Sequence, residues 1–176
     1  MTTYFKEAKG SWIWLVIRLY LGYQWLDAGW HKLTGATPFD ATGFLKGAIA
    51  KAVPATPGAK PLVQAWWGDF LQGFALPNAK LFSFLVMWGE ILIGLALIAG
   101  FATIFAAVMA MIMNFAFLLS GTVSSNPNYL ILEFILVALG GAYAGYLGVD
   151  HWFRPWLRGI AAKILDNKYA KPRHVA

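Results

Sequence analysis

The sequence contains no cysteine and few charged residues. Without cysteine, the chain cannot form a disulfide, use a thiolate nucleophile or hold an iron–sulfur cluster through its own thiolates. Charged residues make up 12% of the 176 residues, against about 25% in soluble domains. Between Lys80 and Asp150 the only charged residues are Glu90 and Glu133. These shortages exclude a soluble enzyme and indicate a membrane protein that crosses the bilayer several times.

Hydrophobic residues make up 59% of the sequence, and they gather in four long runs. A helix rises about 1.5 Å per residue, so about 20 apolar residues cross a hydrocarbon core of about 30 Å. We therefore expect an all-α membrane protein, a four-transmembrane-helix bundle that forms one domain over residues 1–176. The expected spans are residues 11–33, 81–98, 102–119 and 129–147, with an outer loop at 34–80 and a tail at 150–176.

Amphipathic patterns occur in the loop and in the tail. Residues 63–74 place their apolar side chains three and four positions apart, and residues 44–52 do so more weakly. Both patterns predict helices that lie on or dip into the outer leaflet. In the tail, large apolar residues alternate with Arg154, Arg158 and Lys163. This pattern predicts a basic interfacial helix that binds anionic lipid of the inner leaflet.

The distribution of Lys and Arg predicts the orientation in the membrane. The two terminal segments carry eight such residues, the loop from residue 34 to residue 80 carries four, and the two other turns carry none. The eight are Lys6, Lys9, Arg154, Arg158, Lys163, Lys168, Lys171 and Arg173. Because positive charge accumulates on the cytosolic side, we expect a protein of the cytoplasmic membrane with both termini in the cytosol. The net charge of +6 thus reflects topology and not nucleic-acid binding.

Several polar residues fall inside the expected spans, where an ionisable group costs roughly 2.5–3.5 kcal/mol and therefore needs a partner or a task. They are Arg18, Gln24, Asp27, Glu90, Asn114 and Glu133. Helical spacing places two sets on opposite faces of the first span, Arg18, Gly22, Trp25, Gly29 and Lys32 on one, Tyr20, Gln24, Asp27 and His31 on the other. We expect one face to line the bundle interior and the other to be covered by the outer loop or a second protomer. Arg18 and Glu90 then form either a buried ion pair or part of a ligand site.

Five segments carry a resemblance to a known family. They are RLYLGYQWLDAGWHKLTG (18–35), FDATGFLKGAIAKA (39–52), FALPNAKLFSFLVMWGEILIGLALIAG (74–100), NFAFLLSGTVSSNP (114–127) and GVDHW (148–152). The sequence resembles the DoxX/DoxD family, which includes the DoxD membrane subunit of thiosulfate:quinone oxidoreductase. The resemblance implies a four-span, quinone-linked redox component, with Arg18, Trp25, Gly29, Lys32, Glu90, Asn114 and Glu133 as the positions to examine.

A quinone site needs donors for two carbonyl groups, a proton acceptor and an apolar slot. We expect Arg18 and Glu90 as catalytic groups, and Trp25, Asn114 and Glu133 beside them around the quinone. Lys32 and His31 at the outer end of the first span are candidates for an anionic substrate such as thiosulfate.

A haem held by two histidines is not expected, because the three histidines fall at different depths, and a His/Met pair is the alternative for haem. The sequence shows no flavin motif, and no iron–sulfur or metal site is expected. The expected partners are membrane lipid, quinone and a DoxA-like or other redox subunit, with a homodimer through the Gly141-x-x-x-Gly145 segment or the second polar face of the first span. The alternative is a non-catalytic membrane scaffold that docks a redox enzyme.

Overall fold

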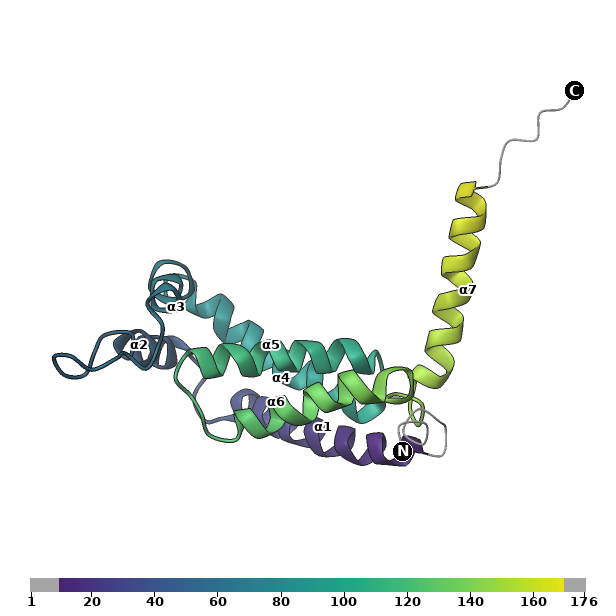
Figure 1. Ribbon diagram of the computed structural model, residues 1–176, viewed down its shortest axis with the longest axis horizontal. Coiled ribbons are helices and arrows are strands. Elements are labelled where there is room, and N and C mark those ends of the chain that lie inside the picture. Colours follow the sequence, from purple (N-terminus) through teal and green to yellow (C-terminus); the bar gives the residue numbers. More distant parts are fainter. Residues whose placement is uncertain (1–9, 170–176) are drawn as a thin grey trace, which may run out of the picture.

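All regular secondary structure in the part of the chain that the computed structural model describes, residues 10–169, is helical. Four helices lie side by side along one axis, α1 (Ser11–Thr34), α4 (Ala79–Ala99), α5 (Thr103–Leu119) and α6 (Asn126–Ile135) (Figure 1). Their shared core contains Trp14, Leu21, Trp25, Leu97 and Leu136, among other buried residues. The all-helical prediction is confirmed, and α1, α4 and α5 begin and end close to the expected positions.

Close packing of α1 against α4 fixes the register of the bundle. Gly22 and Gly29 of α1 face Gly94, Ile91 and Glu90 of α4 so closely that an added Cβ would lie within about 3 Å of backbone or side-chain atoms of α4. Because the two helices run antiparallel in this register, Thr34 at the end of α1 lies level with about residue 86 of α4. The first two turns of α4 therefore extend beyond α1.

These first turns of α4 pack against the helices of the loop. Helix α2 (Thr42–Ala50), helix α3 (Ala65–Phe70) and the π-helical turn Leu71–Ala75 lie at this end of the bundle (Figure 1). A second apolar cluster, with Leu45, Ala48 and Leu71 at its centre, joins them to the start of α4. Both amphipathic segments predicted in the loop are thus helical. Leu45, Ala48 and Leu71 are buried between them and α4, whereas Trp66, Phe70 and Phe74 remain exposed.

The fourth predicted span differs from expectation, because it is not one regular helix. Helix α6 passes into a π-helical turn at Leu136–Gly140 and then into a short 3₁₀ helix at Gly141–Tyr143. Gly141 has φ +47°, a left-handed conformation that ends a right-handed helix. The Gly141-x-x-x-Gly145 segment therefore does not form the helical packing face that its spacing predicted.

Helix α7 (Asp150–Tyr169) begins at the opposite end of the bundle and projects away from it at a steep angle to the bundle's long axis (Figure 1). It is the helix predicted for the tail. Lys6, Lys9, Lys171, Arg173 and His174, which entered the sequence predictions, lie outside the described residues.

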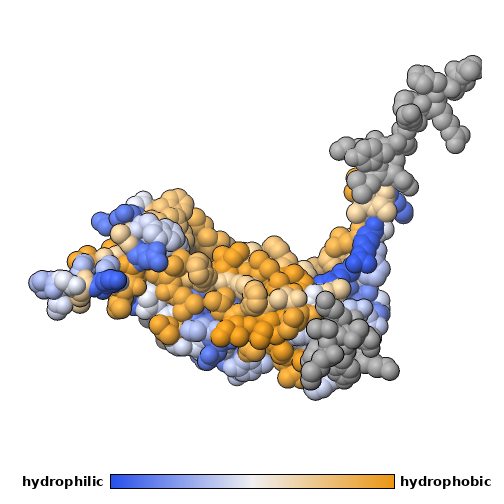
Figure 2. Space-filling view, in the orientation of Figure 1, coloured by the Kyte–Doolittle hydropathy of each residue, from blue (hydrophilic) through white to orange (hydrophobic). Residues whose placement is uncertain are grey.

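The surface of the bundle is strongly apolar. Figure 2 shows hydrophobic residues across the bundle, with hydrophilic residues gathered near α2 and along α7. Among the described residues, one helix, α4, is both long and apolar enough to cross a membrane, and α5 is apolar but has 17 residues. Exposed side chains such as Phe84 and Leu92 on α4 are unusual for a soluble protein and suit contact with lipid.

Candidate functional site

The bundle interior contains a carboxylate that receives hydrogen bonds from two side-chain donors, an indole and an amide. Trp25 Nε1 donates to Glu133 Oε1 at 2.8 Å, and Asn114 Nδ2 lies 2.9 Å from both Oε1 and Oε2 of Glu133. The three side chains come from α1, α5 and α6, and each is at least 96% buried. Close by on α1 and α6, Gln24 donates a hydrogen bond to the hydroxyl of Tyr129. Hydrogen-bond donors on two helices thus offset the desolvation free energy of a carboxylate buried on a third helix.

A second buried carboxylate belongs to Glu90 of α4. It lies beside Lys32, which is about two helical turns after Trp25 on α1. Lys32 Nζ contacts Glu90 Oε2 at 2.7 Å, and it also donates to the carbonyl oxygen of Ala28 at 3.3 Å. The side chain of Glu90 is 4% exposed, whereas that of Lys32 is 25% exposed. Lys32 therefore connects a buried carboxylate to the surface at the end of α1.

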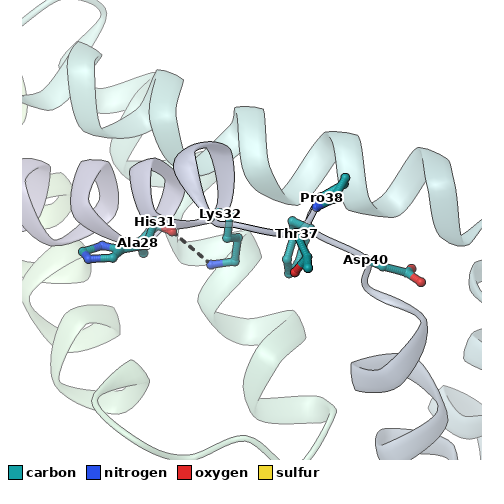
Figure 3. Close-up of a pocket in the computed structure, with 8 residues that line it drawn as sticks. Ala28, His31, Lys32, Thr37, Pro38 and Asp40 are labelled. Carbon is teal, nitrogen blue, oxygen red and sulfur yellow. Dashed lines mark hydrogen bonds between the residues drawn. The ribbon is translucent and has the colours of Figure 1, made fainter.

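At this surface lies an open pocket of about 650 Å³. Its walls come from the last turns of α1 and from the segment that leads into α2 (Figure 3). The lining residues are Ala28, His31, Lys32, Gly35, Thr37, Pro38, Phe39 and Asp40. The Nζ of Lys32 is 5.4 Å from the centre of the Phe39 ring. The pocket thus combines an ammonium donor with an aromatic wall.

Two carboxylates lie in or beside this pocket. Asp40 accepts hydrogen bonds from the hydroxyl and the backbone N–H of Thr42, at 2.7 and 2.9 Å, and these bonds hold the pKa of Asp40 below its ordinary value. Asp27 lies 3.4 Å from Nδ1 of His31. With Glu90 beside Lys32, the pocket has no excess of positive charge.

The model of the DoxX family matches residues 13–122, which is more than half of the chain and includes α1 to α5. The chain belongs to the DoxX family. This family is membrane-associated, and it includes DoxD-like subunits. A comparison of this DoxX chain with curated proteins found no match, and neither did a comparison with solved structures.

Arg18 lies at the other end of the bundle in this DoxX chain. Its side chain is 1% exposed, and its Nη2 donates to the carbonyl oxygen of Leu147 at 2.8 Å. The guanidinium occupies the space where a side chain on Gly100 or Gly148 would be. Arg18 therefore joins α1 to the turn after α4 and to the segment before α7.

The predicted site residues thus form three separate groups. Trp25, Asn114 and Glu133 meet in the interior. Lys32 and His31 line the pocket, with Glu90 beside Lys32, and Arg18 lies at the other end of the bundle. The predicted pairing of Arg18 with Glu90 is wrong, because Glu90 pairs with Lys32 instead. Arg18 and Lys32 are 14 residues apart, which is about 21 Å along a helix.

The prediction that one polar face of α1 lines the bundle interior is confirmed, and the structure shows which face this is, since Arg18, Gly22, Trp25 and Gly29 are all buried. The opposite face is partly covered from within the same bundle, because Tyr129 of α6 contacts both Tyr20 and Gln24. Phe39 and Asp40 were not predicted from the sequence as pocket residues. The signal that could have identified them is their place in the family-like segment 39–52, shortly after the first span.

Proposed function

We propose that this DoxX chain is the membrane subunit of a quinone-linked oxidoreductase, and that the pocket at the end of α1 receives the quinone headgroup. The observation that carries the proposal is the Lys32–Glu90 pair. A buried carboxylate is joined there to an ammonium group that lines an open pocket at the end of a highly apolar bundle. An intramembrane ionisable pair next to a pocket is typical of a functional site.

The residues of the pocket fit a quinone headgroup, which is neutral and has two carbonyl acceptors. Lys32 can donate to one carbonyl, and the ring of Phe39 with Pro38 supplies an apolar wall. A bound quinone would accept two electrons and two protons. Glu90, beside Lys32, is the carboxyl group placed to hold a proton for this site.

An anionic donor such as thiosulfate fits this pocket less well. The charge of Lys32 is matched by Glu90, and Asp40 adds a negative charge of its own. An anion would therefore gain little electrostatic energy there. We propose that thiosulfate or another small reductant delivers its electrons through a partner, a DoxA-like or other redox subunit, and that Lys32 and His31 serve the quinone pocket.

The proposed setting is the cytoplasmic membrane, with α1, α4, α5 and the α6 segment as four spans. The apolar surface of the bundle supports this setting. The excess of Lys and Arg in the terminal segments supports a topology with the termini in the cytosol and with α2 and α3 outside. Arg18 is then a positioning residue at the cytosolic end.

The proposal is tested by extracting and quantifying quinone from the purified protein by mass spectrometry, before and after loading with excess ubiquinone or menaquinone. We expect near-stoichiometric quinone in the wild type and loss of it in Lys32→Met and Glu90→Gln. Lys46→Gln, an exposed lysine on α2, is the matched control and should retain quinone. Variants are compared only as monodisperse protein. Absence of quinone from folded, loaded wild type would refute the proposal.

A second candidate function is a scaffold that docks a redox enzyme without binding quinone. The observation that favours it is the hydrogen-bonded set of Trp25, Asn114 and Glu133, in which the polar groups satisfy one another. Such a set can serve stability alone. In this case the pocket variants would lose no quinone, and a redox enzyme would copurify with the wild type in mild detergent.

A further inference from the structure

Helix α7 carries its large apolar side chains on one side. With about 100° of rotation per residue, they fall within an arc of about 140°. They are Trp152, Phe153, Trp156, Leu157, Ile160 and Ile164. All but Phe153 are exposed, Trp152 to 71%. Tryptophan at such exposure is unfavourable in water, so this arc, which we call the apolar arc, requires an apolar environment.

The start of α7 is fixed firmly to the bundle. The backbone N–H groups of Val149 and Asp150 donate to the carbonyl oxygens of Ala99 and Gly100, at 3.1 and 2.8 Å. The Asp150 carboxylate accepts hydrogen bonds from the backbone N–H groups of Ala102 and Thr103, at 2.8 and 3.0 Å. The direction in which α7 leaves the bundle is therefore set by the fold.

The apolar arc faces the side on which the bundle lies. Phe153, a member of the arc, packs on Phe101 at the turn between α4 and α5, with 4.7 Å between the ring centres. Helix α7 projects from the end of the bundle at a steep angle to the bundle's long axis (Figure 1). An arc on the bundle side of α7 therefore also faces the medium that surrounds the bundle at this end. For a bundle in a membrane, that surrounding is the surface of one leaflet.

The charged side chains of α7 identify the kind of surface that the helix contacts. Among the side chains that the structure describes in α7, the exposed charges are those of Arg158 and Lys163, both positive. The single acidic side chain among them, Asp150, is buried at 2% exposure and engaged in the contacts above. Arg154 adds a third cation, 3.6 Å from Asp150. Cations beside exposed tryptophans favour anionic headgroups.

We propose that α7 lies flat on an anionic lipid leaflet at the cytosolic end of the bundle, with its apolar arc among the acyl chains. Lys163, at the edge of the arc, reaches the phosphates, and Arg158, on the opposite side of the helix, adds positive charge above the leaflet. This contact depends on the bundle crossing the membrane and not on quinone binding. The partner class is the phosphate of an acidic phospholipid.

Because the chain has no cysteine, single cysteines can report the depth of α7. Spin labels at Ile164→Cys, on the apolar arc, and at Ala162→Cys, on the other side of the helix, are compared in nanodiscs. The full-length protein is placed in phosphatidylcholine alone or with phosphatidylglycerol. We expect the label at 164 to be accessible to oxygen and protected from a water-soluble nickel chelate in the anionic discs. The label at 162 should remain accessible to nickel.

Charge dependence is tested with Arg158→Gln/Lys163→Gln, which should lose the protection of the label at 164 in anionic discs. The matched control, Lys46→Gln/Lys60→Gln, removes two exposed lysines at the opposite end and should keep it. Equal nickel accessibility at 164 and 162 in both lipids would overturn the proposal. So would protection at 164 that occurs in native membranes but not in anionic discs, which would indicate a protein partner.

Discussion

The carboxylate of Glu133 takes hydrogen bonds from an indole and an amide on two other helices, and each donor is buried. At the scale of single residues this arrangement makes the donors as important as the acceptor. A buried donor that loses its acceptor, or an acceptor that loses its donor, costs about 1–3 kcal/mol.

We therefore predict that Trp25→Phe lowers the free energy of unfolding by about 1–3 kcal/mol, because Glu133 loses its indole donor while the aromatic volume is nearly kept. Thermal unfolding in detergent is the measurement. Trp30→Phe is the control, since Trp30 lies on the same helix and is 55% exposed. Equal losses in the two variants would show that the hydrogen bond to Glu133 is unimportant.

The residue scale is also where sequence reasoning failed most clearly. The sequence indicated that Glu90 needs a partner, and it placed Arg18 and Lys32 on the same face of α1. The choice between them depended on how far α1 slides along α4. That register is set by the approach of Gly22 and Gly29 to α4, which depends on tertiary packing and leaves no local signal.

At the scale of helices, small residues let α1 and α4 come into backbone contact. A Cβ on Gly94 would lie 2.5 Å from the backbone nitrogen of Leu26, and one on Gly29 would lie 2.8 Å from the backbone nitrogen of Ile91. Separating the helices would also draw Lys32 away from Glu90, because these two residues lie on the same pair of helices.

Gly94→Ala is predicted to lower stability by about 1–3 kcal/mol through overpacking, and to reduce quinone retention together with it. Gly47→Ala is the matched control, because Gly47 is also helical but has no atom within 4 Å of an added Cβ. We expect the control to be unchanged or slightly more stable, since alanine favours a helix. The measurement is the unfolding curve of each variant. A Gly94→Ala variant with the stability of the wild type would contradict the close approach of α1 and α4.

Helix positions were predictable where hydrophobic runs are long and end in clear turn residues, as for α1, α4 and α5. Prediction failed in the fourth run, where apolar residues continue through Gly140 and Gly141. Hydrophobicity alone does not distinguish a regular helix from the π-helical and 3₁₀ turns found there. The pocket could not be predicted either, because it depends on where residues 35–40 lie relative to the last turns of α1.

At the scale of the whole molecule, the two ends of the bundle differ in character. One end has α2, α3 and the pocket, and the other has the Arg18 contacts and α7 (Figure 1). The orientation of these ends in the membrane follows from charge in the proposed topology.

Cysteine labelling tests this orientation directly. We predict that a membrane-impermeant maleimide labels Lys46→Cys in intact cells, and that it labels Ala162→Cys only after permeabilisation. Both positions are exposed, so a difference between them reports the side of the membrane. Labelling of residue 162 in intact cells, without labelling of residue 46, would reverse the proposed topology.

Asp150 serves two helices at once. It is the first residue of α7, and its carboxylate caps the N-terminus of α5, whose own N-cap residue, Ala102, has no side chain that can do so. Detaching α7 would leave α5 without this cap, at a cost of roughly 0.5–2 kcal/mol. A tag or fusion partner attached behind α7 that displaces this helix would therefore also disturb the N-terminus of α5, the helix that carries Asn114.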